Sequence, residues 1–248
     1  MNTVLDKFFK STYLNIASIL SRDAGPKILY YHDIYDGQRY YLHGTPLELF
    51  KKHIAVLSRE AWRATSSLPC KEKEYMLTLD DGFRGIWDCR EYICEMGLKP
   101  MIFLASDLIG KSQYLDWNEI LELQKLGFNF QAHTWSHRRL TEVPICEWDH
   151  ELGDSRKLLS DKLQKDIRHL CFPQGRFNSK IIDFARNQGY DWFYTCIYGN
   201  ADKRILPNLI CRQLVQEVGP RTFKALLNGG ANHLWRHYYN QHCVSCVN

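Results

Sequence analysis

Two adjacent aspartates in the stretch YMLTLDDGFRG are the residues most suited to chemistry in this chain. Asp80 and Asp81 follow an apolar run and precede Gly82. Neighbouring carboxylates repel each other, so the pair needs a positive charge close by. A bound divalent metal ion would supply that charge. In the alternative interpretation Asp80 caps a helix and Asp81 pairs with Arg84, because Asp-Gly is common in turns.

A histidine pair offers the remaining ligands for such an ion. AHTWSH places His133 and His137 four residues apart, and a helical turn there would point both imidazoles the same way. The pattern is weak by itself: HLWRH repeats it at His233 and His237, which we interpret as a chance pair on a helix. Together with Asp81, the first pair leaves coordination positions open, as catalytic metal sites do. Mixed nitrogen and oxygen ligands favour zinc, and cobalt, nickel or iron also fit.

The composition describes an ordinary globular chain. Of the 248 residues, 45% are hydrophobic and 24% are charged, and the net charge is +4. Such a mild charge without a Lys/Arg run argues against nucleic-acid binding. No apolar stretch approaches the ~18 residues of a transmembrane helix. We therefore predict a cytoplasmic protein.

The two ends of the chain are predicted to flank the main domain. Residues 1–26 are expected to form an N-terminal helical segment, packed on the protein body or in peripheral contact with a membrane. Its apolar residues near helical spacing are Leu5, Phe8, Phe9, Tyr13, Ile16 and Leu20. Nine irregularly spaced cysteines indicate reduced thiols rather than a disulfide framework. Cys243 and Cys246 form a lone C-x-x-C, which we interpret as part of an exposed tail.

Short apolar runs alternate with longer amphipathic stretches from residue 27 onward, which predicts a parallel sheet covered by helices. The expected strands are residues 27–31, 75–79, 101–105, 128–132, 169–172, 191–196 and a seventh within 206–215. The expected helices are residues 45–61, 85–97, 117–127, 147–163, 179–189 and 222–229. No glycine-rich nucleotide-binding motif follows any of these strands.

The polar residues of interest all follow predicted strands. His32 follows KILYY, Asp80 follows YMLTL, His133 follows FNFQA, and residues 173–175 follow HLCF. The carboxyl ends of parallel strands meet on one face of a barrel, where such folds carry their active sites. We expect these residues to converge on one rim.

The motifs TLDDG, HTWSH and FPQG, in that order, resemble the NodB-type polysaccharide deacetylases, carbohydrate esterase family 4. The resemblance runs from about residue 27 to 196. It implies an α/β fold, a distorted (β/α)7 barrel of the NodB homology type in a single domain. On this basis the barrel would span residues 27–230, and residues 231–248 would form a C-terminal tail.

The resemblance also implies roles for individual residues. Asp80 would be the general base, and Asp81, His133 and His137 would hold the metal ion. The late L-x-H motif that supplies an acid histidine in many members has no clear match. LYYH at residues 29–32 is instead similar to the permuted subgroup of poly-N-acetylglucosamine deacetylases, which makes His32 the candidate acid, against the alternative of a histidine that only ends a strand.

The third motif would form the substrate pocket. Pro173, Gln174 and Gly175 would shape it, with the Gln174 backbone N–H donating to the oxyanion. Two departures from the family stand here: Cys171 replaces a frequent arginine, and Gln174 replaces a frequent aromatic residue. Arg176 follows the motif and cannot be assumed to replace the missing arginine.

Two further residues match the subgroup less closely. Trp117 in LDWNEI would line the sugar site, although Asp116 and Glu119 also read as a capping box at a helix start. Arg212 resembles a late arginine that would support a carboxylate of the site.

These roles imply a metal-dependent hydrolase that removes N-acetyl groups from an amino-sugar glycan or glycoside. A cytoplasmic chain would act on a precursor glycan, a lipid-linked or nucleotide-linked sugar, or a small glycoside. Two alternatives remain: a metal hydrolase of another amide or ester, and a degenerate, non-catalytic barrel that binds a carbohydrate or a partner.

Overall fold

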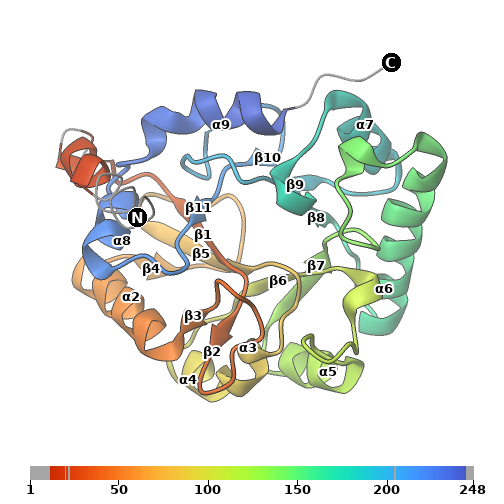
Figure 1. The fold of residues 1–248 in the computed structure, drawn as a ribbon, viewed down its shortest axis with the longest axis horizontal. Coiled ribbons are helices and arrows are strands. Elements are labelled where there is room, and N and C mark those ends of the chain that lie inside the picture. The colour runs from red at the N-terminus through yellow and green to blue at the C-terminus, as the bar shows by residue number, and fades with distance from the viewer. Residues whose placement is uncertain (1–11, 20, 22, 204, 244–248) are drawn as a thin grey trace.

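The computed structural model describes residues 12–243 except 20, 22 and 204. Within them, a nine-stranded parallel sheet forms the centre of the molecule (Figure 1). Its hydrogen-bonded order is β10-β9-β8-β7-β6-β5-β1-β11, and β4 pairs with β5 beside this path. The strands are β1 (Lys27–Tyr31), β4 (Arg63–Ala64), β5 (Glu74–Leu79), β6 (Met101–Leu104), β7 (Asn129–Ala132), β8 (His169–Cys171), β9 (Trp192–Tyr194), β10 (Leu209–Ile210) and β11 (Gln213–Leu214).

The sheet curls until its two edge strands approach each other. β10 pairs with β9 at one edge and β11 pairs with β1 at the other, yet only Cys211 and Arg212 separate them in the chain. Three Cα–Cα steps lead from Ile210 to Gln213 and span at most about 11 Å, so the edges lie close together. The predicted distorted barrel is confirmed. The single seventh strand predicted within residues 206–215 is wrong, because Cys211 and Arg212 break it where the chain crosses between edges.

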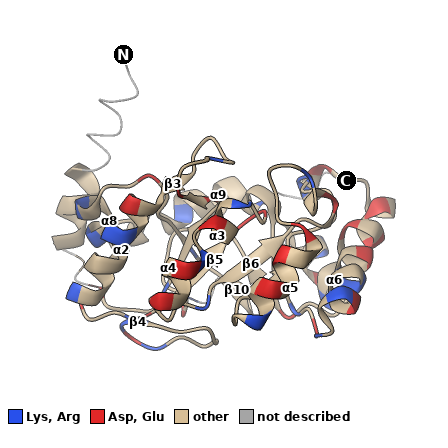
Figure 2. Cartoon of the chain, turned by 90° about the horizontal axis from the view of Figure 1, so that it is seen from below, with Lys and Arg blue, Asp and Glu red and all other residues tan. Residues whose placement is uncertain are grey.

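Helices surround the strands in Figure 1. They are α2 (Leu47–Arg59), α3 (Gly85–Asp88), α4 (Arg90–Glu95), α5 (Trp117–Lys125), α6 (Ser155–Leu163), α7 (Ser179–Asn187), α8 (Pro220–Leu227) and α9 (Trp235–His242). The helix predicted over residues 85–97 divides into α3 and α4, and that over 147–163 starts as a π-helix (Asp149–Asp154) before α6. In the view of Figure 2, charged residues lie on outer helices such as α4, α5 and α6.

Burial follows the layers. All five residues of β1 are buried, as expected for a parallel strand covered on both faces. A small paired sheet of β2 (Ile34–Tyr35) and β3 (Thr45–Pro46) follows β1 and brackets residues 36–44, which we call the 36–44 loop. Short 3-10 turns complete the chain at Ser106–Leu108, Leu140–Glu142, Ile145–Glu147, Pro173–Gly175 and Asn232–Leu234.

The segments at the two ends are partly described. Residues 12–19 are helical, with Leu14 buried and Tyr13, Ile16 and Ile19 exposed. Leu5, Phe8, Phe9 and Leu20 of the predicted helical segment lie outside the described residues, as does Cys246. The predicted tail contains α9, whose Trp235 packs against the core. The division at residues 26 and 230 stays a prediction. Within the part of the chain that is described, a search for a helix long and apolar enough to span the bilayer finds none.

Candidate functional site

The aspartate pair lies at the end of β5, in a turn that its sequence dictates. Asp80 donates its backbone N–H to the Tyr31 carbonyl of the neighbouring strand (3.0 Å). Asp81 and Gly82 then take left-handed backbone angles, with φ of 71° and 77°. Gly82 tolerates this angle at no steric cost, and a Cβ there would lie 2.6 Å from the Leu104 side chain. The turn leaves both carboxylates buried at the rim of the barrel.

Arg212 is the cation nearest to Asp80. Its Nη1 and Nη2 donate to Oδ1 and Oδ2 of Asp80, both at 2.7 Å, and its side chain is completely buried. Burial would raise the pKa of Asp80, but the Arg212 guanidinium outweighs this effect and holds that pKa below its usual range. The support predicted from Arg212 is therefore present, and Asp80 does not depend on a metal ion for its counter-charge.

Asp81 faces the two histidines of the HTWSH motif. Its Oδ1 lies 3.2 Å from Nε2 of His133 and 3.0 Å from Nε2 of His137. A tetrahedral ion with ligand bonds of 2.0–2.2 Å separates its ligand atoms by about 3.3–3.6 Å, close to these distances. The alternative of an Asp81–Arg84 pair is not observed, since Arg84 pairs with Glu119 (2.7 Å).

The side-chain hydrogen bond of His133 indicates which kind of ligand Asp81 and the two histidines are suited to bind. Its Nδ1 lies 2.7 Å from the Cys171 carbonyl oxygen, which can only accept, so Nδ1 carries the proton. The Nε2 of a neutral His133 therefore directs a lone pair at Asp81. Among the described residues, Oδ1 of Asp81 is buried without a hydrogen-bond partner of acceptable geometry. Converging lone pairs and an unpartnered oxygen fit a cation, and the Cys171 carbonyl orients the ligand as second-shell groups do.

A second cluster of three potential ligands overlaps the first: Asp80, His133 and Cys171. It suits a cation poorly, because Arg212 already donates to both oxygens of Asp80 and approaches the Cys171 sulfur at 3.1 Å. Burial also raises the pKa of Cys171 well above its usual value, so the thiolate that a metal needs is disfavoured. The Asp81 set is the better candidate metal centre.

The helical turn that would point both imidazoles the same way is not observed. Residues 133–139 form a loop in which Thr134 and His137 have positive φ values of 65° and 62°. The loop folds back so that the His137 N–H donates to the Thr134 hydroxyl (3.2 Å). This brings the two imidazole centroids to 4.9 Å without a helix. We call residues 133–139 the histidine loop.

His32 directly follows β1 and lines the same pocket. Its Nδ1 lies 2.8 Å from Oε1 of Gln216, and its ring stacks on Tyr41 of the 36–44 loop with centroids 5.0 Å apart. An amide oxygen accepts only, so Nδ1 donates and Nε2 remains for a ligand in the pocket. Neither Gln216 nor Tyr41 was predicted, because nothing in their local sequence links them to His32.

The pocket has a volume of about 530 Å³. Besides the aspartates, histidines and Gln174, its lining includes Tyr40, Tyr41, Leu42, Phe83, Leu108, Gln113, Tyr114 and Cys196. Tyr41, Phe83 and Tyr114 stack in sequence, with centroid distances of 5.0 and 4.7 Å. The aromatic wall formed by these three rings comes from three different loops, which is why the sequence did not reveal it.

The third motif, residues 173–175, forms a turn beside the pocket. Pro173 and Gly175 are buried, and only Gln174 of the three lines the pocket, with a left-handed φ of 56°. A Cβ on Gly175 would lie 2.7 Å from the Cys196 backbone nitrogen, so the close approach requires glycine. The Arg139 guanidinium donates to the Gln174 side chain (2.5 Å) and orients it.

Trp117 is not part of the pocket. It is the first residue of α5, where Asp116 and Glu119 form the capping box (2.8 and 3.0 Å) and Lys162 lies over the indole ring (5.7 Å). The structural interpretation of Trp117 agrees with this position, and its role at the sugar site stays a prediction. His233 likewise bonds to Tyr13 (2.7 Å), away from the candidate metal centre.

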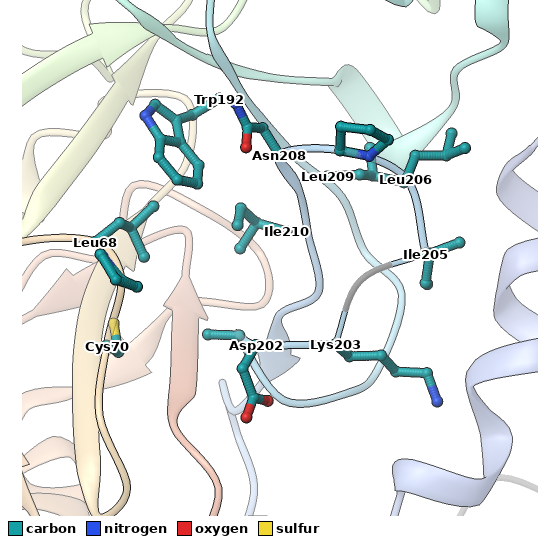
Figure 3. A pocket seen from close by; sticks show the side chains of 13 residues that line it. Leu68, Cys70, Trp192, Asp202, Lys203, Ile205, Leu206, Asn208, Leu209 and Ile210 are labelled. Atoms are coloured by element: carbon teal, nitrogen blue, oxygen red, sulfur yellow. The ribbon is translucent and has the colours of Figure 1, made fainter.

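A second cavity of about 350 Å³ contains none of the predicted site residues (Figure 3). It lies toward the amino ends of strands, where Trp192, Leu68 and Ile210 face one another. Asp202 and Lys203 are its charged lining residues. The mainly apolar lining of this cavity distinguishes it from the pocket that holds the aspartates and histidines.

Comparison with known proteins identifies the family of this chain. The family model for polysaccharide deacetylases matches residues 68–193, just over half of the 248 residues. The chain belongs to the polysaccharide deacetylase family. The family predicted from the three motifs is confirmed, and its model covers both the aspartate pair and the histidine loop.

Related proteins show the same fold. The chain is 25% identical over 187 residues to YxkH of Bacillus subtilis (strain 168), provisionally named a polysaccharide deacetylase, and spans 66% of that protein's length. The structure of the Streptococcus pyogenes deacetylase PplD in complex with acetate is 20% identical, with a TM-score of 0.72 over 82% of this chain and 98% of that one. IcaB from Ammonifex degensii is 16% identical, with a TM-score of 0.72 over 84% and 98% of the two chains.

Proposed function

We propose that the protein is a metal-dependent N-deacetylase that releases acetate from an N-acetylated amino sugar. The observation that carries this proposal is the placement of the ionised Asp80 beside a separate set of ligands, Asp81, His133 and His137. A carboxylate kept anionic by Arg212 can accept a proton, and the neighbouring set can hold a divalent cation. Proton acceptor and ligand set share one pocket with His32.

The ion fits Asp81, His133 and His137, whose lone pairs converge. When bound, it would supply Lewis-acid chemistry that polarises a carbonyl and lowers the pKa of water from ~15.7 to ~7. Zinc suits the ligands best, with cobalt, nickel and iron as alternatives. Two histidines and one carboxylate leave positions open, as a catalytic centre requires.

The protein's own groups account for the proton transfers. Asp80 takes a proton from water as the water oxygen bonds to the acetamide carbon, and Arg212 holds the Asp80 oxygens in place for this transfer. The Gln174 backbone N–H donates to the developing oxyanion, a contribution of typically ~3 kcal/mol per donor. His32 then protonates the nitrogen as the C–N bond breaks. The products are acetate and a free amino sugar.

The pocket supports a sugar substrate. Its volume of about 530 Å³ accommodates a compact polar ligand, and the aromatic wall of Tyr41, Phe83 and Tyr114 offers apolar surface beside polar groups. Gln174 lines the proposed substrate site, and the buried Pro173 and Gly175 shape the turn that carries it. We retain a precursor, lipid-linked or nucleotide-linked sugar as the substrate class, together with the cytoplasmic location predicted from the sequence.

The structure also bears on the alternative of a degenerate binding barrel. That alternative drew on Cys171 and Gln174, which stand where the family often has an arginine and an aromatic residue. In this chain the Arg212 guanidinium approaches both the Cys171 sulfur (3.1 Å) and Asp80 (2.7 Å). The connection between β10 and β11 thus supplies a guanidinium to the site. The cysteine at position 171 therefore does not leave the site without this positive charge.

Acetate release tests the proposal. The purified chain, loaded with zinc or cobalt, is assayed against N-acetylated glycosides, O-acetylated sugars and simple amides. We expect metal-dependent acetate release from the N-acetylated sugars and its loss in Asp80→Asn with the metal retained. Release from simple esters alone would favour the hydrolase of another substrate. Sugar binding by a metal-loaded wild type that releases no acetate from any substrate would favour the non-catalytic barrel.

A further inference from the structure

The histidine loop holds two side chains in a backbone conformation that they do not prefer. Thr134 and His137 have φ values of 65° and 62°, although residues with a Cβ rarely occupy the left-handed region. Thr134 is β-branched, which makes this angle especially unfavourable. Contacts from outside the loop must therefore stabilise the conformation that aims His133 and His137 at Asp81.

Glu151 makes the most extensive of these contacts. Its Oε2 accepts the backbone N–H groups of Trp135 (3.1 Å) and Ser136 (3.0 Å), and its Oε1 accepts the Ser136 hydroxyl (2.5 Å). The Glu151 side chain is completely buried. One carboxylate thus satisfies three donors at the turn between the two histidines.

The same carboxylate also binds the residue after His137. Arg138 donates to Oε1 of Glu151 through Nε (3.2 Å) and Nη2 (2.9 Å). The guanidinium supplies the positive charge that a buried carboxylate needs. Arg138 also contacts Glu147 on the surface (2.5 Å), so Glu147 shares the arginine without touching the backbone of the loop.

The element that carries Glu151 is unusual. Asp149–Asp154 is a π-helix that continues into α6, and such turns are rare and are often found at functional sites. Ser155, four residues after Glu151, donates its hydroxyl to the Thr134 carbonyl (3.1 Å). Ser155 and Glu151 therefore hold the two polar atoms of one peptide unit, the Thr134 carbonyl and the Trp135 N–H, directly after the unfavourable Thr134 angle.

We infer that Glu151 is a positioning residue for the metal centre, whose carboxylate sets the histidine loop in its ligand-ready conformation before a metal ion binds. This inference rests on the proposed function. Glu151 itself is not among the ligands or the residues that line the pocket. Its effect reaches the site through the backbone at Trp135 and Ser136.

Metal affinity is the direct test. Zinc binding to the full-length chain is measured by calorimetry for wild type, Glu151→Ala, Glu151→Gln and Glu151→Asp, with Glu147→Ala as the matched control. We expect Glu151→Ala to weaken binding about 10- to 100-fold, the usual effect of losing an outer-shell partner. Glu151→Gln loses one charged acceptor, so its zinc affinity should lie between those of wild type and Glu151→Ala. Glu147→Ala removes only the surface partner of Arg138 and should bind zinc as wild type does.

Amide hydrogen exchange of the metal-free protein separates positioning from general stability. We expect faster exchange at Trp135 and Ser136 in Glu151→Ala, with unchanged protection in the strands β5 and β6. If Glu151→Ala does not fold, Glu151→Asp retains the charge but is one methylene shorter, so it should still weaken zinc binding and loosen these two amides. A folded Glu151 variant with wild-type affinity and exchange overturns the inference. A wild type that binds no metal overturns the proposed function instead, while the exchange data still test the role of Glu151.

Discussion

Arg212 and Asp80 form a bidentate ion pair inside the barrel although they are 132 residues apart in the sequence. Both nitrogen–oxygen distances are 2.7 Å, and Arg212 is completely buried while Asp80 is nearly so. Arg212 occupies the short connection between β10 and β11, where the two edges of the curled sheet approach each other. The closure of the barrel and the charge of the proposed base therefore depend on the same residue.

Removing the guanidinium should destabilise the fold as well as stop turnover. Arg212→Met leaves Asp80 buried without its cation, a change that typically costs about 3–5 kcal/mol of unfolding free energy. Urea unfolding of wild type, Arg212→Met, Asp80→Asn and the double variant measures the coupling between the two residues. We expect the double variant to be more stable than Arg212→Met, because the uncompensated carboxylate is gone. Equal stability of wild type and Arg212→Met would contradict the assigned role.

Metal content should depend on one histidine pair and not on the other. Elemental analysis of the wild type should find about one divalent ion per chain. Asp81→Ala and His137→Ala should each lose it, because two ligands rarely retain an ion that three hold. His237→Ala is the matched control, since His237 belongs to the same sequence pattern but contacts Gln241 on α9. Loss of metal in the control, or retention in both site variants, would place the ion elsewhere.

The acid role of His32 predicts a loss of rate without a loss of metal. His32→Ala removes the group that protonates the leaving nitrogen, and a positioned acid is worth roughly 10²–10⁴-fold in turnover. Its metal content should stay at the wild-type level, because His32 is not a member of the candidate ligand set. His43→Ala serves as a control from the 36–44 loop, where His43 pairs with Glu217 at the surface (3.1 Å). Unchanged turnover in His32→Ala would assign the proton to another group.

Acidification should destabilise the protein through His53. This buried histidine donates Nε2–H to the Val218 carbonyl (2.7 Å), accepts the Tyr31 hydroxyl at Nδ1 (2.8 Å) and stacks on Phe223, so the hydrogen bond from Tyr31 requires the neutral ring. Burial lowers the pKa of His53 from 6.5 to about 4. The unfolded chain therefore binds a proton below pH 6.5 that the folded chain does not bind until about pH 4.

The contribution of His53 to the unfolding free energy is complete above pH 6.5 and declines as the pH falls toward 4, by at most about 3 kcal/mol. Urea unfolding of wild type and His53→Gln between pH 7.5 and 4.5 isolates this contribution from that of the carboxylates. We expect the wild type to lose more stability on acidification than the variant does. Parallel pH dependence of the two proteins would show that His53 does not control it.

Part of the candidate site could be predicted from local sequence. Asp80, Asp81, His32 and His133 each follow a buried apolar strand, and the carboxyl ends of parallel strands share one rim. The assignment of the strands alone therefore predicted that these four side chains converge in one pocket. His137 was predicted from the HTWSH motif, although the histidine loop that places it is not helical.

Other site residues gave no local signal. Tyr41 reaches His32 because the Asp33 carboxylate accepts the N–H groups of Tyr40 and Tyr41 and holds the 36–44 loop over the pocket. Glu151 reaches the histidine loop from a helix whose π-turn no periodicity indicates. Trp117 shows the converse case: a matching tryptophan in a sequence motif lies on a helix start outside the pocket.

The sequence by itself determined the family, the parallel barrel and the candidate chemistry, because strand pattern and motif residues are adjacent in the chain. The resemblance named Arg212 as support for a carboxylate, but only the tertiary structure decided that this carboxylate is Asp80 and that Glu151 holds the histidine loop in place. Arg212 and Glu151 both act across distances in the chain that no local pattern spans. Their contacts exist because the curled sheet brings its edges together and packs α6 against the histidine loop. A buried charge requires a partner, but only the folded geometry selects which one.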